Sequence, residues 1–259
     1  MALVLENGVW KLQADSGGVT ATTTTVTPGT DVAYTYGGGT LVGAGGALDG
    51  WLIQNPGFIT RIEEFDGSPG PARIEIDFDF TGAPTNYRWS SVNQCPRGAP
   101  AIYLPENVVG NFDFFCEFDA PSTPVTDDQQ NFGIAAWNPG DADSTALANI
   151  ISFGAQTTTS GRYRFIRQVT GGLLGNVSVL SGRAWNTQQF CRLQRVDGEM
   201  KGFQKLLDAD PWTAEGDEFW DVASNDARLG FAIGSDIGRT GTIRIYQAEA
   251  TYFPVSVLP

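Results

Sequence analysis

Three carboxylates alternate with large apolar side chains in the segment ARIEIDFDF, residues 72–80. Glu75, Asp77 and Asp79 fall on one side of this pattern, and isoleucines and phenylalanines fall on the other. Because successive side chains of a β-strand point to opposite faces, the alternation predicts a half-buried strand with the three carboxylates on one face. Such a row could supply an acid, a base or a nucleophile. A solvated acidic face, with Arg73 beside it, explains the same pattern without chemistry.

Histidine is absent from the 259 residues. This excludes Ser-His-Asp and Cys-His nucleophilic sites and His-ligated zinc, iron or copper. The three cysteines, Cys95, Cys116 and Cys191, are widely spaced, which argues against a zinc knuckle or a disulfide framework. Cys116 and Cys191 lie in apolar strand patterns, so we expect buried free thiols and folding in a reducing compartment; a bridge between them is the alternative if their strands are neighbours. We expect no metal and no cofactor.

Two tryptophans beside polar loops are candidate glycan-binding residues. Trp137 precedes a loop with Asn138, Asp141 and Asp143, and Trp185 flanks another loop. An indole has a flat apolar body on which a sugar ring can stack, but tryptophan is also a large core residue. The loop carboxylates could ligate calcium, but the chain has no EF-hand pattern, and solvated turns are the favoured explanation.

The charge of the chain is unevenly distributed. The net charge is −13; residues 1–130 carry five basic and 16 acidic side chains, whereas residues 162–205 carry eight basic and two acidic ones. The acidic balance disfavours nucleic-acid binding, which requires lysine and arginine against phosphates. Solvated outer faces of alternating strands are the favoured explanation of the basic segment. The alternative is a contact for an acidic partner, including the acidic half of a second copy. Its candidate contact residues are Arg162, Arg164, Arg192, Lys201 and Lys205.

The residues that position these side chains read as β-strands joined by short turns. Residues 190–207 predict a hairpin, because Asp197-Gly198 suits a type I′ turn between two strand patterns. Pairing Val196 with Glu199 then places Arg192 opposite Phe203. Only residues 214–224 have a mildly helical pattern. Further strands are expected at 10–15, 19–26, 32–36, 47–53, 58–65, 111–119, 131–137, 148–155, 162–169, 176–180, 228–233 and 242–253.

From residue 111 onward the order of these segments resembles the concanavalin A-like and laminin-G-like jelly-roll sandwiches. The resemblance rests on FDFFCEFD, NFGIAAWN, FCRLQRVDGEMKGFQ, RLGFAIGS and TIRIYQAEATYF in that order. It implies an all-β, antiparallel two-sheet jelly-roll sandwich over residues 47–259. Residues 1–46, rich in threonine and glycine, are expected to form an extended N-terminal arm with short strands. The family is often carbohydrate-binding, sometimes hydrolytic and often purely structural in virus particles.

The acidic strand also resembles the Glu-x-Asp-x-Glu strand of laminarinase-type glycoside hydrolases. That resemblance implies Glu75 as nucleophile, Asp77 as the residue that tunes it and Asp79 as general acid. Here the last position is aspartate rather than glutamate, so the acid would reach one carbon less far. The structural interpretation of the strand is favoured.

These observations favour a non-catalytic structural or binding protein. The concrete expectation is an accessory or decoration protein of a phage capsid or tail, made in the host cytoplasm. Its partners would be copies of itself, other virion or surface proteins and, as a further candidate, a glycan. A secretory signal pattern and a long apolar run are both missing from the sequence, so no membrane partner is expected. The alternative is a glycoside hydrolase or lectin of the concanavalin A-like fold.

Overall fold

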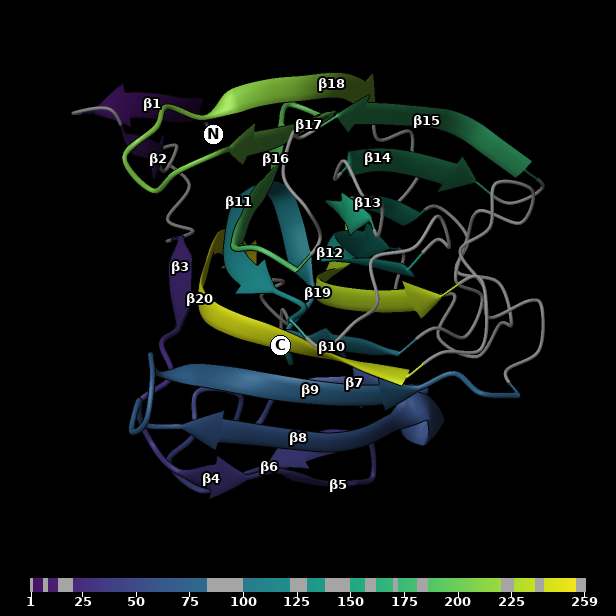
Figure 1. Cartoon of the computed structure of the whole chain (residues 1–259). Helices are drawn as coiled ribbons and strands as arrows, with labels where there is room; N and C mark the ends of the chain where they lie inside the picture. Colours follow the sequence, from purple (N-terminus) through teal and green to yellow (C-terminus); the bar gives the residue numbers. More distant parts are fainter. Residues whose placement is uncertain are drawn as a thin grey trace.

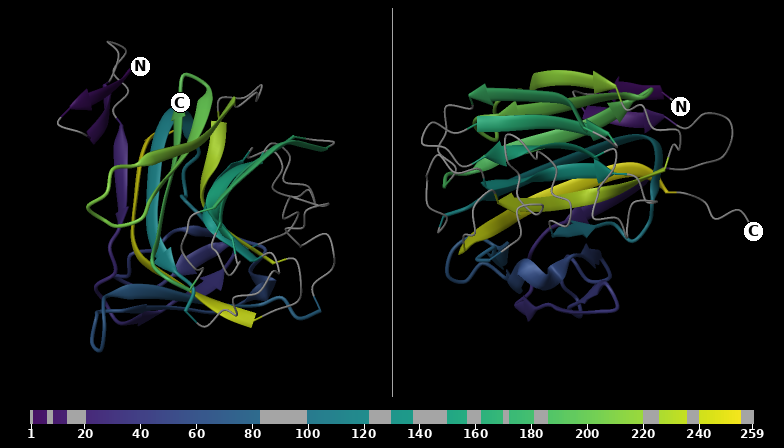
Figure 2. Two further views of the ribbon diagram at one scale, coloured as in Figure 1. Left: turned by 45° about the horizontal axis from the view of Figure 1, so that its top comes forward. Right: turned by 90° about the vertical axis from the view of Figure 1, so that its right-hand side faces the viewer.

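The chain is an all-β protein built from antiparallel strands. The computed structural model describes residues 2–6, 9–13, 21–82, 100–121, 130–137, 150–156, 162–169, 172–180, 186–219, 226–235 and 240–254. Eighteen strands in these residues form one continuous hydrogen-bonded sheet, which folds over into two facing layers (Figures 1 and 2). The one helical element among them is a short 3₁₀ turn, η1 (Pro56–Phe58). This architecture confirms the fold class predicted from the sequence.

The first sheet contains the acidic strand and the predicted hairpin. Its strands follow the order β4, β8, β9, β20, β11, β16, β17 and β18, with β3 also paired to β20. Their bounds are β3 (Thr22–Val26), β4 (Val32–Ala33), β8 (Ile59–Phe65), β9 (Arg73–Asp79), β11 (Val108–Asp119), β16 (Gln189–Val196), β17 (Glu199–Lys205), β18 (Thr213–Phe219) and β20 (Thr240–Pro254).

The second sheet faces the first. Its order is β5, β6, β7, β10, β19, β12, β13, β14 and β15. The bounds are β5 (Thr35–Gly37), β6 (Thr40–Val42), β7 (Leu52–Gln54), β10 (Ala101–Tyr103), β12 (Gln130–Trp137), β13 (Ile150–Gln156), β14 (Arg162–Val169), β15 (Gly172–Leu180) and β19 (Asp226–Ser235). The start of β11 also pairs with β19, which joins the two sheets at one corner.

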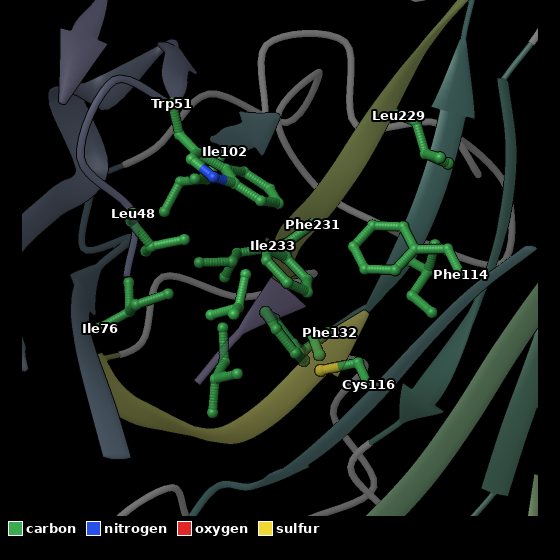
Figure 3. Packing of buried hydrophobic residues seen from close by; sticks show 14 of the residues in the cluster. Leu48, Trp51, Ile76, Ile102, Phe114, Cys116, Phe132, Leu229, Phe231 and Ile233 are labelled. Carbon is green, nitrogen blue, oxygen red and sulfur yellow. The ribbon is translucent and has the colours of Figure 1, made fainter. Parts of the chain in front are cut away.

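Apolar side chains from both sheets fill the space between them (Figure 3). Phe114 of β11 and Phe231 of β19 have ring centroids 5.2 Å apart, and Phe132 of β12 stacks on Phe231 at 5.8 Å. Trp51 stacks on Phe231 at 5.7 Å. Burial of such large aromatic surfaces is a dominant favourable term in folding, so this core fixes which face points outward in the strands that contribute to it.

The predicted hairpin forms with the expected register. Val196 pairs with Glu199 and Arg192 with Phe203. Asp197 and Gly198 both have positive φ, at 52° and 87°, as a type I′ turn requires. Local turn chemistry therefore sets this register.

Two other expectations are changed by the structure. The helix expected at 214–224 is wrong for residues 214–219, which belong to a strand. This strand, β18 (Thr213–Phe219), pairs with β17 as the last strand of the first sheet. The expected N-terminal arm divides into two parts. β1 (Ala2–Glu6) and β2 (Val9–Gln13) form a separate two-stranded sheet, whereas β3 to β6 belong to the sandwich, and Val26 and Leu41 lie in its core.

Candidate functional site

The predicted row of carboxylates lies on the outer face of the first sheet, the face turned away from the core. Strand β9 buries its isoleucines and Phe78 in the core and leaves Glu75, Asp77 and Asp79 on the outer face. Flanking strands β8 and β20 pair with β9 in register and add arginines to the same face. The alternation read from the sequence is therefore confirmed.

Glu75 is held by three arginines. Its Oε1 accepts hydrogen bonds from Arg73 Nε at 2.8 Å and from Arg244 Nε at 3.0 Å. Its Oε2 accepts one from Arg61 Nη2 at 3.1 Å. Burial by itself would raise the pKa of Glu75, but the adjacent Arg73 and Arg244 outweigh it and hold the pKa below its ordinary value. Glu75 is therefore a stable anion that balances arginine charge.

The other two carboxylates of the row are also hydrogen-bonded within the chain. Asp77 accepts from Arg61 Nε at 2.6 Å and from the Thr242 hydroxyl at 2.7 Å. Asp79 accepts from the backbone N–H of Thr81 at 2.7 Å, and bonds to Thr81 lower its pKa. A general acid must hold a proton at the working pH, which needs a raised pKa rather than a lowered one. The arrangement suits an ion-pair network better than acid–base chemistry.

A hollow lies beside this network on the same outer face. Its volume is about 480 Å³, within the range of small-molecule sites. Four neighbouring segments of the first sheet line it: the turn before β9, the strands β20 and β11, and the residue before β16. The lining residues are Pro71, Ala72, Glu117, Asp119, Gln188, Tyr246 and Gln247, and we call this the Asp119 hollow.

Asp119 gives the hollow its electrostatic character. One carboxylate oxygen, Oδ2, accepts a hydrogen bond from the Tyr246 hydroxyl at 2.8 Å. The other, Oδ1, is buried and has no hydrogen-bond partner among the described residues. Burial raises the pKa of Asp119, and Tyr246 and the charge of Arg244 offset only part of that effect. Burial and the bond to Asp119 also raise the pKa of Tyr246 to about 12.

The rim of the hollow carries amide and carboxylate groups. Gln188 donates its side-chain N–H to Glu117 Oε1, which joins β11 to the segment before β16. Gln247 is exposed on β20. The lining thus combines acceptor oxygens, amide donors and a phenol, but no lysine or arginine. Groups of this kind exchange hydrogen bonds with the hydroxyls of an uncharged polar ligand.

The basic residues predicted as partner contacts are engaged within the chain where their side chains are described. Arg192 makes a two-point ion pair with Asp113 and lies over the Phe203 and Trp212 rings. Lys205 donates to Asp208 and lies over the Phe190 ring at 4.8 Å. Lys201 lies 3.6 Å from Glu199. Arg162 and Arg164 belong to β14, and their side chains are outside the described part.

The sugar-stacking expectation at Trp137 requires correction. Trp137 is fully buried, in a second apolar cluster on the outer side of the second sheet with Tyr103, whose ring meets it edge-on at 5.3 Å. A ring with no exposed face cannot stack on a sugar, so Trp137 is a core residue rather than a sugar-binding one. Asn138, Asp141, Asp143 and Trp185 lie outside the described residues.

The residues of the Asp119 hollow were not singled out from the sequence. Alternation in FDFFCEFD does place Glu117 and Asp119 on an outer face. The partner of Asp119 was not readable, because Tyr246 is 127 positions away and a register shift between Glu117 and Phe118 intervenes in the pairing of β11 with β20. Such irregularities change which side chains meet and leave no simple sequence signal.

The described residues contain no group of three or more Cys, Asp or Glu side chains that could hold a metal ion. The described residues also contain no helix long and apolar enough to cross a membrane.

Comparisons with known proteins define the fold. A search of protein-family models and a search of curated proteins each found no match. Among solved structures, a functionally unknown protein from Saccharomyces cerevisiae matches 74% of this chain and 92% of its own, with 8% identity and a TM-score of 0.50. At this identity the likeness describes the fold alone.

Two further structures have lower scores. The GH43 protein BlXynB from Bacillus licheniformis matches 69% of this chain at 8% identity and a TM-score of 0.49, and this chain spans 33% of its length. The exoplasmic/lumenal domain of VIP36 matches 81% of this chain and 85% of its own, at 12% identity and a TM-score of 0.45.

Proposed function

We propose that this chain is a non-catalytic β-sandwich that binds a glycan in the Asp119 hollow. The observation that carries the proposal is the convergence of Asp119, Tyr246, Glu117 and two glutamine amides on one hollow of about 480 Å³. Sugar hydroxyls both donate and accept, so a lining that combines carboxylates, amides and a phenol matches their chemistry. Asp119 Oδ1 adds a buried acceptor whose hydrogen-bonding capacity is unused among the described residues.

The charge network on β9 supports a binding role without hydrolysis. Hydrolysis of a glycosidic bond uses two carboxyl groups, one of which must be protonated to act on the leaving oxygen. Glu75 has a lowered pKa, and both Glu75 and Asp77 are paired with arginines. The carboxylates of β9 therefore lack a proton donor of the required kind, and we propose that the chain is not an enzyme.

The binding test is a panel of soluble neutral oligosaccharides titrated calorimetrically into the purified chain. We expect saturable binding that Asp119→Asn and Gln247→Ala each weaken at least tenfold. The matched control is Glu249→Gln, two positions from Gln247 on β20 and away from the hollow lining. Binding that is unchanged in both hollow variants, or no binding by the wild type, refutes the assignment of the hollow.

Turnover is tested separately with the same oligosaccharides. Reducing-end release should stay at background for the wild type and for Glu75→Gln. Release by the wild type that Glu75→Gln abolishes supports the alternative function, a glycoside hydrolase that uses Glu75, Asp77 and Asp79.

For its setting, we propose that the chain is a subunit of a larger assembly, most concretely a virus particle formed in a host cytoplasm. The supporting observation is that β1 and β2 pair only with each other among the described strands, at the periphery of the molecule (Figures 1 and 2). A two-stranded sheet is marginally stable alone, so contact with another subunit would stabilise it. Light scattering should show oligomers for the full chain and loss of them on deletion of residues 1–20; oligomers that survive the deletion refute a role for this sheet.

A further inference from the structure

We propose that Cys116 and Cys191 form a reversible disulfide that joins β11 to β16 in the centre of the first sheet. The two residues are direct partners in the antiparallel pairing of these strands. Both are free thiols in this structure, and both are fully buried. The site is therefore a pair of reduced cysteines placed opposite each other by register.

The spacing of paired strands brings these cysteines within reach of a bridge. Directly opposed residues of an antiparallel pair have Cα atoms about 4.5–5.5 Å apart, and disulfides span about 4.4–6.8 Å between Cα atoms. Their Cβ atoms, about 4.5–5.5 Å apart in such pairs, need to approach by about 1 Å at most. Alternation also puts both side chains on the core side, because Phe114, Phe118 and Leu193, two positions away, are buried in that core.

The surroundings keep the pair reduced until the strands separate. Cys116 lies among buried aromatic and aliphatic side chains (Figure 3). Burial raises the thiol pKa of both cysteines, and for Cys116 the neighbouring Cys191 raises it further. Thiolate, the reactive form, is thus scarce in the folded chain. We place bridge formation during folding or transient opening, when both sulfurs meet a small-molecule disulfide.

The redox step uses oxidised glutathione, or another disulfide of that class, as oxidant. One cysteine thiolate attacks the glutathione disulfide, forming a mixed disulfide and releasing one glutathione thiol. The second cysteine thiolate displaces the second glutathione and closes the bridge. The two cysteines together lose two electrons and two protons, which the oxidant gains as it becomes two thiols. The bridge closes a long loop between positions 116 and 191, and it fixes the strand that carries Glu117 and Asp119.

The experiment uses the full chain with Cys95→Ser, so that two thiols remain. The protein is unfolded in urea, refolded with oxidised glutathione and examined by intact mass, thiol titration and thermal melting. We expect loss of two hydrogens, no free thiol, and a Tm roughly 5–10 °C above that of the same sample after dithiothreitol. Cys191→Ala in the same background is the control, and it should retain one thiol or a glutathione adduct and show no such dithiothreitol-sensitive rise.

Three outcomes overturn the proposal. One is a refolded two-cysteine protein with two free thiols, and another is a protein that carries only glutathione adducts. The third is a bridged species that melts below the reduced form, because that result would show that the bridge distorts this pairing of strands rather than fitting it. Near-ultraviolet circular dichroism of the reduced proteins establishes that each variant has refolded, so a folding failure in the control is not mistaken for an absent bridge.

Discussion

At the residue scale, single buried carboxylates organise segments that are distant in sequence. Glu64 of β8 is 2% exposed and accepts hydrogen bonds from the backbone N–H groups of Gly29 at 2.9 Å, Thr30 at 3.2 Å and Ala47 at 2.7 Å. It also accepts one from the Tyr34 hydroxyl at 2.5 Å. A buried charge is tolerated when its acceptor sites are filled in this way. Glu64 therefore ties residues 29–47 to the first sheet.

Replacing Glu64 by glutamine should destabilise the fold. The amide nitrogen would face donors that now meet a carboxylate oxygen, so at least one buried N–H or O–H loses its acceptor. We expect the free energy of unfolding to fall by roughly 2–4 kcal/mol, measured by urea denaturation. The control is Glu63→Gln, a more exposed neighbour on β8, which should change it by less than about 1 kcal/mol. Equal stability of the two variants would contradict the role of Glu64.

Glu75 should make stability depend on pH at the acid end. Its pKa in the folded chain is lower than its ordinary value, so the unfolded chain takes up a proton first as pH falls. The contribution of Glu75 is therefore fully present above its ordinary pKa of about 4.5 and is lost as pH falls through the lowered folded value. Glu75→Gln should be less stable than the wild type at pH 7, and the difference should shrink below pH 4. A difference that is constant from pH 7 to pH 3 would contradict this linkage.

At the element scale, the turn between β16 and β17 shows how a dipeptide fixes a register. Gly198 has φ of 87°, a conformation that strains a residue with a Cβ atom. The turn fixes β16 against β17, because a shift by one position would turn each side chain to the other face. The opposition of Cys116 and Cys191 belongs to the separate pairing of β16 with β11.

Gly198→Ala should lower the free energy of unfolding by about 1–2 kcal/mol, because alanine disfavours positive φ. The space around Gly198 is open, so the loss would report backbone strain rather than a steric clash. Gly29→Ala is the matched control: its surroundings are also open and its φ lies outside the left-handed region. Urea denaturation of both variants measures the contrast, and an unchanged Gly198→Ala protein would show that the turn tolerates a side chain.

At the scale of the whole molecule, opposite charges lie in different parts of the chain. Residues 1–130 carry a net charge of −11 and residues 162–205 carry +6. If copies assemble by setting these parts against each other, the contact is heterologous and closes into a ring or repeats across a shell. Several of the charges are already paired within the chain, as for Arg192 with Asp113 and Lys201 with Glu199, so such a contact would compete with these internal pairs.

Assembly by this contact should weaken as salt increases. The screening length falls from about 10 Å at 0.1 M to about 3 Å at 1 M. Replacing Arg162, Arg164 and Lys201 together by glutamate should reduce the oligomer fraction at low salt, measured by light scattering, while the melting curve shows that the subunit stays folded. A triple variant that assembles like the wild type at both low and high salt would show that the charge asymmetry has no role in assembly.

Features that depend only on adjacent residues could be predicted from the sequence. The alternation around Glu75 and the Asp197-Gly198 turn were readable because strand periodicity and turn conformation depend on adjacent residues. The absence of histidine likewise excluded whole classes of site from composition alone. These inferences need no knowledge of which strands become neighbours.

Contacts between side chains of different strands became known only from the folded structure. Tyr246 bonds Asp119 across 127 positions, three arginines from three strands surround Glu75, and Trp137 is buried rather than exposed. Each result follows from the order of strands in the two sheets and from the register shift between β11 and β20. Strand order is set by the combined burial of many apolar faces, so no short segment of the sequence encodes it.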